Sequence, residues 1–232
     1  MSVKFRIMSW NIGSFVFLKY GKYFGGLTGD QHEYFQPNLN GNLISNVTQD
    51  INPDFLYLQE FWFPKDAKKI KILEEYPHQV FIDTWYRRSG VLIASKKQFS
   101  QKLIAGFPII TCDDFTIIPI HLNSFSSSIR LKEIKKLCEI LSIVTQPIVL
   151  LGDTNIWSRK NLFLFSKDKE GYLKLTESLI DASKNIMSTN FFGFGLDKIF
   201  VSKAITIETV ASPKIRGKFM DHYPIYIDAN LK

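Results

Sequence analysis

Polar side chains that can bind a metal ion or move a proton flank apolar, strand-like runs at five places in this sequence. The places are Trp10-Asn11, Gln59-Glu60, His121-Leu122-Asn123, Gly152-Asp153-Thr154-Asn155, and Asp197 taken together with Asp221-His222. A carboxylate beside a buried strand is costly unless it is paired, hydrogen-bonded or bound to a metal. Taken singly, Asp153 is explained as a cap of the following turn and Glu60 as a charge at a helix N-terminus. Capping does not explain why polar residues flank apolar runs at all five places.

The ligand types in these clusters indicate which metal and which reaction they suit. Carboxylate and amide oxygens with neutral imidazole are typical of Mg²⁺ or Mn²⁺ sites, and no cysteine occurs in any of the clusters. A hard metal ion surrounded by Asp, Asn and His suits phosphoester hydrolysis.

These residues must be positioned by strands and helices, which the sequence predicts as short β-rich runs alternating with segments of helical periodicity. Strands are predicted at 4–10, 55–58, 79–83, 90–95, 101–107, 115–121, 147–151, 198–202, 205–210 and 224–227, and helices at 39–51, 65–75 and 129–141. Consecutive strands joined by hairpins, with helices between them, favour an α/β fold of two packed, mainly antiparallel sheets flanked by helices.

Composition limits the class of protein. The 232 residues are 45% hydrophobic and 22% charged with a net charge of +7, which is typical of a folded globular chain, and we expect one domain over 1–232. Membrane-spanning, secreted disulfide-rich and fibrous classes are excluded. The longest aliphatic run, 148–151, is far short of the roughly 18 residues of a membrane span, and two cysteines make no disulfide scaffold. Without a secretory segment, we expect the cytoplasm or another reducing intracellular compartment.

The segment 13–38 differs from the rest because aromatic residues alternate with glycines there. Such dense glycines prevent a regular helix or strand, so a long surface loop is predicted, serving either as a binding edge or as packing over the core.

The order of the polar clusters resembles the endonuclease/exonuclease/phosphatase superfamily, which includes deoxyribonuclease I, exonuclease III-type endonucleases, sphingomyelinases, inositol polyphosphate 5-phosphatases and 5′-tyrosyl-DNA phosphodiesterases. Residues 52–60 resemble the family element NPDxxxLQE, Gly152-Asp153-Thr154-Asn155 resembles GDxN, and Asp221-His222-Tyr223-Pro224 resembles SDHxP. The resemblance spans Trp10 to Pro224 and implies a four-layered α/β/β/α sandwich. Met220 departs from the small residue usual at its position.

The resemblance implies a role for each matching residue. Glu60 is the principal Mg²⁺ ligand, Asn11 holds the metal-side geometry or a phosphate oxygen, and Asp221 lies near the metal or supports His121. Asp153 orients or deprotonates the attacking water, and Asn155 steadies the phosphate.

The two histidines of the site complete the implied machinery. His222 contacts the scissile phosphate, and Asp197 fixes its tautomer through a hydrogen bond. His121 donates to the phosphate or to the leaving oxygen. The resemblance therefore implies hydrolysis without a covalent intermediate.

Substrate choice is predicted from weaker signals. Residues 121–124 and 152–155 most resemble 5′-tyrosyl-DNA phosphodiesterases and small nucleases, and the positive charge suits nucleic acid. Candidate substrate contacts are Asn155, Asn123, Arg130, Arg87 and Phe194, with a solvated hairpin as the alternative for Arg87. Two other functions stay open: a phosphodiesterase or phosphatase of sphingomyelin or inositol phosphates, with a phospholipid surface as partner, and an inactive binding module. Oligomeric state and the mode of cutting are not predicted.

Overall fold

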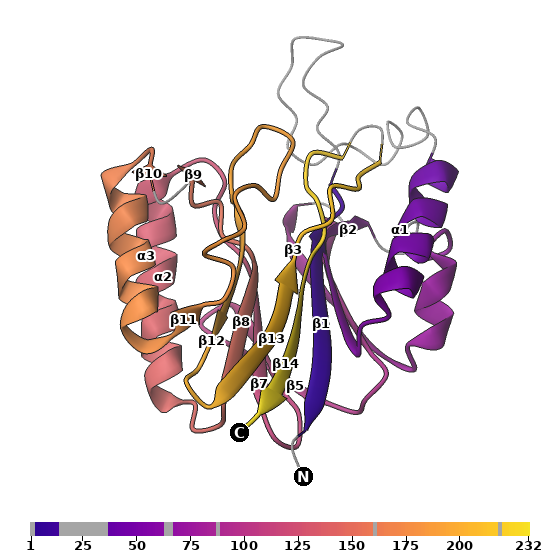
Figure 1. Cartoon of the computed structure of the whole chain (residues 1–232), viewed down its shortest axis with the longest axis horizontal. Helices are drawn as coiled ribbons and strands as arrows, with labels where there is room; N and C mark the ends of the chain where they lie inside the picture. The colour runs from indigo at the N-terminus through magenta and orange to yellow at the C-terminus, as the bar shows by residue number, and fades with distance from the viewer. Residues whose placement is uncertain (1–2, 14–36, 63–66, 87–88, 160–161, 218–219) are drawn as a thin grey trace.

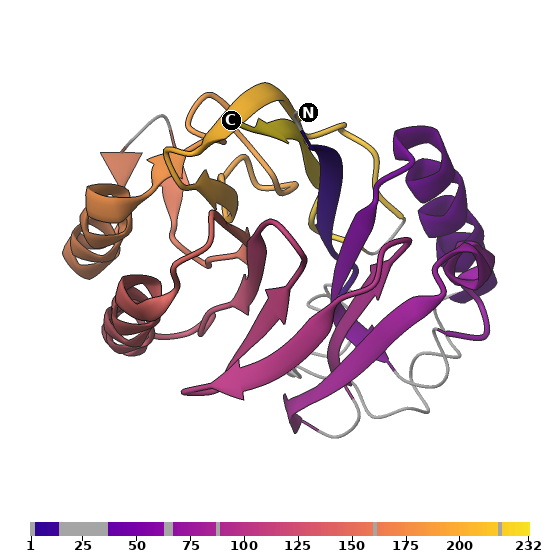
Figure 2. The same ribbon diagram turned by 90° about the horizontal axis from the view of Figure 1, so that it is seen from below.

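The computed structural model describes residues 3–13, 37–62, 67–86, 89–159, 162–217 and 220–232, with only the backbone at 37–40, 62, 84–86 and 89. The predicted loop lies outside the described residues from 14 to 36, and so does Arg87. Two six-stranded sheets pack face to face with helices on their outer faces, giving four layers (Figures 1 and 2). This confirms the predicted α/β sandwich.

One sheet contains the first and last strands of the chain. Its order is β13-β14-β1-β2-β4-β3, with bounds β1 (Lys4–Asn11), β2 (Phe55–Trp62), β3 (His78–Tyr86), β4 (Ser89–Ser95), β13 (Ile205–Ala211) and β14 (Ile225–Leu231). Strands β1 and β2 are parallel, while all other neighbours in this sheet are antiparallel.

The second sheet repeats this arrangement. Its order is β11-β12-β8-β7-β6-β5, with bounds β5 (Ser100–Ile104), β6 (Phe107–Thr111), β7 (Thr116–His121), β8 (Ile148–Asp153), β11 (Ile180–Asp181) and β12 (Asp197–Val201). Here β7 and β8 form the parallel pair. A separate two-stranded ribbon consists of β9 (Ser158–Arg159) and β10 (Leu162–Phe163).

Helices connect both parallel pairs because parallel neighbours need a crossover. Helix α1 (Pro37–Ile51) lies between β1 and β2, and α2 (Ser127–Ile143) lies between β7 and β8. The side chain of Ser126 accepts from the backbone N–H of Ile129, so α2 begins where the serine-rich stretch predicts a cap. Helix α3 (Ser166–Ser178) packs beside α2 on the same outer face (Figure 1). Among the described residues, no helix is long and apolar enough to cross a membrane.

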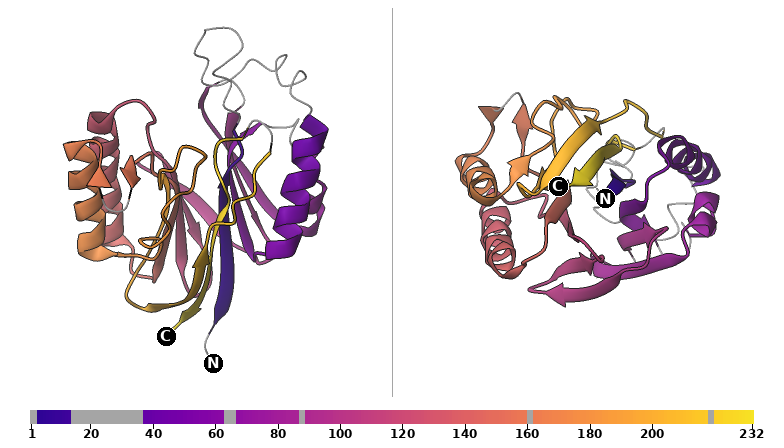
Figure 3. Two further views of the ribbon diagram at one scale, coloured as in Figure 1. Left: turned by 45° about the horizontal axis from the view of Figure 1, so that its top comes forward. Right: turned by 60° about the horizontal axis from the view of Figure 1, so that its bottom comes forward.

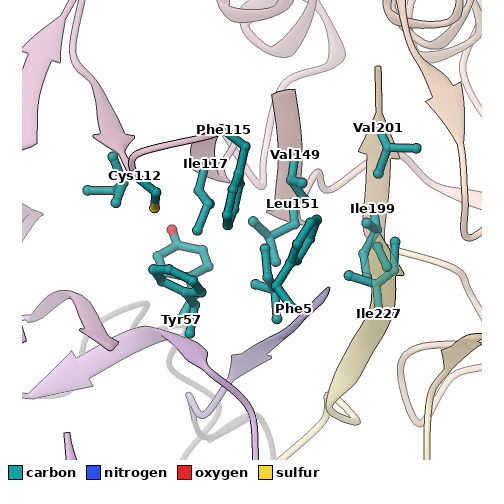
Figure 4. Close-up of a cluster of buried hydrophobic side chains, with 14 of the residues drawn as sticks. Phe5, Tyr57, Cys112, Phe115, Ile117, Val149, Leu151, Ile199, Val201 and Ile227 are labelled. Atoms are coloured by element: carbon teal, nitrogen blue, oxygen red, sulfur yellow. The ribbon is translucent and has the colours of Figure 1, made fainter. Parts of the chain in front are cut away.

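The apolar core has three parts because the central strands are buried on both faces. Along β1, Phe5 and Ile7 face the other sheet, whereas Met8 and Trp10 belong to the cluster beneath α1. Figure 4 shows the side chains between the sheets, including Phe5, Tyr57, Phe115 and Leu151. A third cluster joins the second sheet to α2 and α3. Burial on both sides explains the nearly continuous apolar runs of these strands.

Besides the two-residue strands β9, β10 and β11, which were not predicted, three elements differ from the sequence-based expectation. The strand predicted at 101–107 is a hairpin of β5 and β6, turning at Ala105 and Gly106, whose φ angles are 51° and 90°. Only a 3₁₀ helix, η2 (Lys71–Glu75), forms in the described part of 65–75. It ends at Tyr76, which is extended because Pro77 follows. Helix α3 was not predicted, since its sequence is mostly polar and only a narrow face packs.

Candidate active site

The parallel pairs bring the polar clusters to one end of the sandwich. In parallel strands the carboxyl ends meet at the same edge, and both pairs end on the side away from the two chain termini (Figures 1 and 3). Asn11 ends β1 and Glu60 lies near the end of β2, while His121 and Asp153 are direct partners at the ends of β7 and β8. Asp197 begins β12 opposite Asp153.

Asn11 connects the two sheets at this end. Its Nδ2 donates to Glu60 Oε1 at 3.0 Å and to Asp153 Oδ2 at 3.1 Å, and its Oδ1 accepts from the Gly13 backbone N–H at 3.0 Å. The Asn11 side chain is buried, so these bonds fix its amide. One amide therefore holds a carboxylate from each sheet in the same small volume.

Glu60 is directed into the site by an irregularity in β2. The pairing of β2 with β4 shifts register between Gln59 and Phe61, and Glu60 adopts a φ of 54°. This bulge turns the Glu60 side chain to the strand end, where it is 42% exposed. A Cβ at Gly13 would lie 1.8 Å from Glu60 Oε2, so only glycine leaves room for this carboxylate. Sequence reasoning did not identify Gly13, because its need arises from a contact with β2.

A tight turn holds Asp153 and Asn155. Gly152 has a φ of 137°, and a Cβ there would meet the Ile120 carbonyl oxygen at 2.0 Å, so the turn requires glycine. Asp153 Oδ1 accepts from the Asn155 backbone N–H at 2.8 Å, and Asn155 Nδ2 donates to the Leu122 carbonyl at 2.9 Å. Both side chains are buried and held at defined positions.

His222 lies behind Asp153 and is held on several sides. Its Nδ1–H donates to Asp197 Oδ2 at 2.8 Å, and its Nε2 lies 3.7 Å from Asp153 Oδ2. The Trp10 indole N–H donates to the backbone carbonyl of His222 at 3.2 Å, and Asn190 forms a β-bridge with it. Burial opposes protonation, but Asp197 and the other nearby carboxylates together raise the pKa of His222 well above its usual range. The carboxylates around His222 therefore favour its protonated form.

His121 and Asp221 complete the cluster. His121 Nε2 lies 3.9 Å from Glu60 Oε1 and 3.8 Å from Asp153 Oδ2. Asp221 Oδ2 lies 3.9 Å from His222 Nε2. Burial and the nearby charges of Glu60 and Asp153 raise the pKa of Asp221 to about 6, although His222 acts in the opposite direction. The site thus gathers more carboxylates than its cations neutralise.

This donor set fits a divalent cation. Atoms of Asp153, Asp197 and His222 lie within 4.8 Å of one another, all three residues are buried, and Asp197 Oδ1 has no hydrogen-bond partner among the described residues. Glu60 and Asp221 add carboxylate oxygens at the more exposed side. Carboxylate oxygens are ligands of hard divalent cations.

Residues 8–218 match the sequence profile of the Endonuclease/Exonuclease/phosphatase family. The chain belongs to this family. No curated protein matches the sequence. Membership supports a phosphoester hydrolase of phosphodiesterase or nuclease type, a class that generally uses a divalent metal.

Solved structures share the family fold at low sequence identity. An endonuclease/exonuclease/phosphatase family protein from Bacteroides thetaiotaomicron has a TM-score of 0.72 and 13% identity, covering 100% of this chain and 99% of that one. Humanized D. rerio TDP2 has a TM-score of 0.69 and 16% identity, covering 98% of this chain and 99% of that one. A functionally unknown conserved protein from Enterococcus faecalis V583 also has a TM-score of 0.69 and 16% identity, covering 98% and 100%.

The structure brings together at one end of the sandwich all the residues predicted for catalysis and metal binding, which are Asn11, Glu60, His121, Asp153, Asn155, Asp197, Asp221 and His222. Of the predicted substrate contacts, Asn155 lies beside Asp153, and the other described ones make contacts within the protein. Asn123 Oδ1 accepts from the backbone N–H groups of Phe125 and Ser126 ahead of α2. Phe194 packs edge-on against Trp157, with ring centroids 4.9 Å apart. Arg87 is outside the described residues.

Arg130 has a structural position that differs from the prediction. It is 1% exposed, and its Nε and Nη2 donate to the two carboxylate oxygens of Asp168 at 2.9 and 2.8 Å. Its Nη1 donates to the carbonyl of Asn123. The guanidinium offers no surface to a substrate, so we correct its assignment: Arg130 joins α2 to α3. The sequence around Arg130 does not indicate that its partner is Asp168, which lies 38 residues away.

Replacing Arg130 with alanine is expected to lower the free energy of unfolding by about 3–5 kcal/mol, because Asp168 would stay buried without its partner. Denaturant unfolding measures this loss. The matched control is Lys135→Ala, which breaks the exposed Lys135–Glu170 ion pair between the same helices and should cost about 1 kcal/mol or less. A stable Arg130→Ala protein with a raised KM would instead favour the substrate contact.

Proposed function

We propose that this chain is a Mg²⁺-dependent phosphodiesterase that hydrolyses phosphodiester bonds in nucleic acid. The observation that carries the proposal is the bridge from Asn11 to Glu60 and Asp153, with two imidazoles within 4 Å of Asp153. Glu60, Asp221 and Asn11 would hold the ion, with Mn²⁺ as a substitute. When bound, the ion supplies neutralisation of charge on the phosphate oxygens.

The chain's own side chains account for the proton and charge movements of hydrolysis. Asp153 accepts a proton from the attacking water, and its position is fixed by the bonds from Asn11 and Asn155. Asn155 orients the phosphate.

The imidazoles act on the opposite side of the reacting phosphate. His222 presents its Nε2–H to a non-bridging phosphate oxygen, because Nδ1 is engaged by Asp197. The raised pKa of His222 favours the protonated imidazole, which suits charge stabilisation rather than proton removal. His121 donates to the leaving oxygen. Hydrolysis then needs no covalent intermediate.

The choice of nucleic acid is supported by the net charge of +7 and by the likeness of residues 121–124 and 152–155 to 5′-tyrosyl-DNA phosphodiesterases and small nucleases. A structural neighbour named TDP2 is consistent with this choice.

A substrate panel tests the proposal. Single- and double-stranded DNA, RNA, a 5′-tyrosyl oligonucleotide, sphingomyelin and inositol phosphates are incubated with Mg²⁺ or with EDTA. We expect oligonucleotide hydrolysis that EDTA abolishes and added Mg²⁺ restores, and that the Asp153→Asn variant lacks. Hydrolysis of lipid or inositol phosphates alone would favour the lipid alternative. Hydrolysis of no compound would favour a binding module.

A further inference from the structure

A pocket of about 510 Å³ adjoins the site and is not used by the proposed chemistry. It lies between the loop that precedes β12 and the loop that precedes β14, and is lined by Phe191, Lys214, Ile215, Arg216, Gly217 and Tyr223. Figure 1 shows both loops, in orange and yellow, at the end of the sandwich where β1 finishes. The pocket is shallow and broadly open to solvent.

The pocket walls are attached directly to the residues around His222. The Phe191 backbone N–H donates to the Asp221 carbonyl at 2.7 Å, and the Tyr223 N–H donates to the Thr189 carbonyl at 2.8 Å. Arg216 Nη1 donates to the Met220 carbonyl at 2.9 Å. The loops that form the pocket walls are therefore bonded to the same segments that hold Asp221 and His222.

The pocket combines cations with aromatic rings. The Arg216 guanidinium lies 4.2 Å from the Phe191 ring centroid, and Lys214 Nζ lies 4.7 Å from the Tyr223 ring centroid. None of the lining residues is acidic, and neither cation forms a salt bridge with a described carboxylate. Lys214 Nζ donates to the Ser188 carbonyl and Arg216 Nη1 to the Met220 carbonyl, so in the described part of the chain both cations bond to carbonyls and pair with no carboxylate.

Phe191 is 58% exposed although it belongs to the wall of a pocket. Its ring meets Phe192 edge-on, with centroids 5.6 Å apart and an interplanar angle of 72°. Exposed aromatic rings next to cations are the features that bind single-stranded nucleic acid, where bases stack and phosphates meet Lys or Arg. An acidic peptide would use the cations but would leave the aromatic wall without a partner.

We propose that this pocket binds the nucleotide adjacent to the scissile phosphodiester, with its base stacked on Phe191 and its phosphate at Lys214 and Arg216. The proposal rests on the proposed function in taking nucleic acid as the substrate. It makes Phe191 and Lys214 determinants of substrate preference that lie outside the group of residues around Asp153.

Binding without turnover tests the pocket directly. The binding of a fluorescein-labelled oligothymidylate of about ten nucleotides is followed by anisotropy in EDTA. Phe191→Ala is expected to weaken binding roughly 5- to 100-fold through lost stacking. Lys214→Ala is expected to reduce the slope of log affinity against log salt by about 0.7, which corresponds to one phosphate contact on a single strand. Arg216 is left unchanged because its bond to Met220 supports the turn before Asp221.

Two matched controls lie away from the pocket. Leu173→Ala removes an exposed apolar side chain from α3, and Lys203→Ala removes an exposed charge beyond the far end of β12. Both should bind the oligonucleotide like the wild type. Absence of oligonucleotide binding by the wild type, wild-type binding by both pocket variants, or equal losses in the controls would each overturn the proposal. The proposal would also be overturned if Phe191→Ala lost binding to phosphatidylserine vesicles while its affinity for the oligonucleotide stayed unchanged. That result would assign the aromatic wall to a membrane surface.

Kinetics separate failure of the pocket from failure of the proposed function. The ratio of kcat/KM for the oligonucleotide to kcat/KM for bis(p-nitrophenyl) phosphate, which carries a single phosphate, should fall in Phe191→Ala and Lys214→Ala. An unchanged ratio with EDTA-sensitive hydrolysis would overturn the pocket alone. Binding that depends on Phe191 and Lys214, in a protein that hydrolyses neither substrate, would support the pocket and overturn the enzymatic function.

Discussion

Replacing Asp153 with asparagine is expected to lower phosphodiester hydrolysis by roughly 10²- to 10⁴-fold, the contribution typical of a positioned general base. The amide has the shape of the carboxylate but cannot take the proton of the attacking water. Asn11 Nδ2 and the Asn155 N–H each donate to one Asp153 oxygen, and in the variant one of these two donors would face an amide NH₂ and lose its acceptor. That loss costs about 1–3 kcal/mol of stability. Initial rates with Mg²⁺ and an oligonucleotide measure the loss, and denaturant unfolding measures the stability.

The matched control for this change is Asp228→Asn. Asp228 lies on β14, opposite Arg6, to which it is joined by a salt bridge, away from the end that carries Asn11. It should keep wild-type turnover. Turnover of the Asp153→Asn variant at the wild-type rate would show that Asp153 is not the base, and the proposed mechanism would then be wrong.

Replacing Glu60 with glutamine is expected to abolish the stabilisation of the protein by Mg²⁺ and to remove most of its activity. A ligand that binds only the folded state stabilises it by about 2.7 kcal/mol at a concentration of 100 Kd. Glutamine has the size of Glu60, and its Oε1 still accepts from Asn11, so the site keeps its shape while it loses a ligand charge. Thermal unfolding with and without Mg²⁺ gives the shift of Tm in each protein.

Glu208→Gln provides the comparison for Glu60→Gln, because Glu208 lies in β13 and forms an exposed ion pair with Lys4. This variant should show the same Mg²⁺-dependent shift of Tm as the wild type. A full Tm shift in Glu60→Gln would exclude Glu60 as the principal ligand. An equal loss in both variants would indicate a general effect of charge.

The central strands were predictable because burial on both faces leaves a continuous apolar run. Residues 148–151 show this in β8, where alternate side chains serve two different core clusters. The outer elements were harder to predict. Helix α3 is mostly polar, and its contact depends on Gly171, where a Cβ would meet Ile134 Cδ1 at 2.5 Å. A close approach between helices has no local sequence pattern.

The substrate contacts were harder to predict than the residues around Asp153. Arg130 and Asn123 have side chains suited to phosphate binding, but both satisfy buried or capping hydrogen bonds around α2. Conversely, Phe191 and Arg216 are 25 residues apart in the sequence, and only the fold brings the ring and the guanidinium together. Contacts between loops depend on the whole fold.

The sequence by itself determined the family and the central strands, and it predicted the chemistry of the site, because acidic, amide and imidazole residues at the ends of apolar runs indicate hard-metal phosphoester chemistry. It also determined that these residues share one end, since strand direction places them there. The tertiary structure decided how they are held: one Asn11 amide between two carboxylates, a glycine at 13 that leaves room for Glu60, and a His222 imidazole bonded to Asp197. These are contacts between segments far apart in the chain, and their distances follow only from the packing of one sheet on the other.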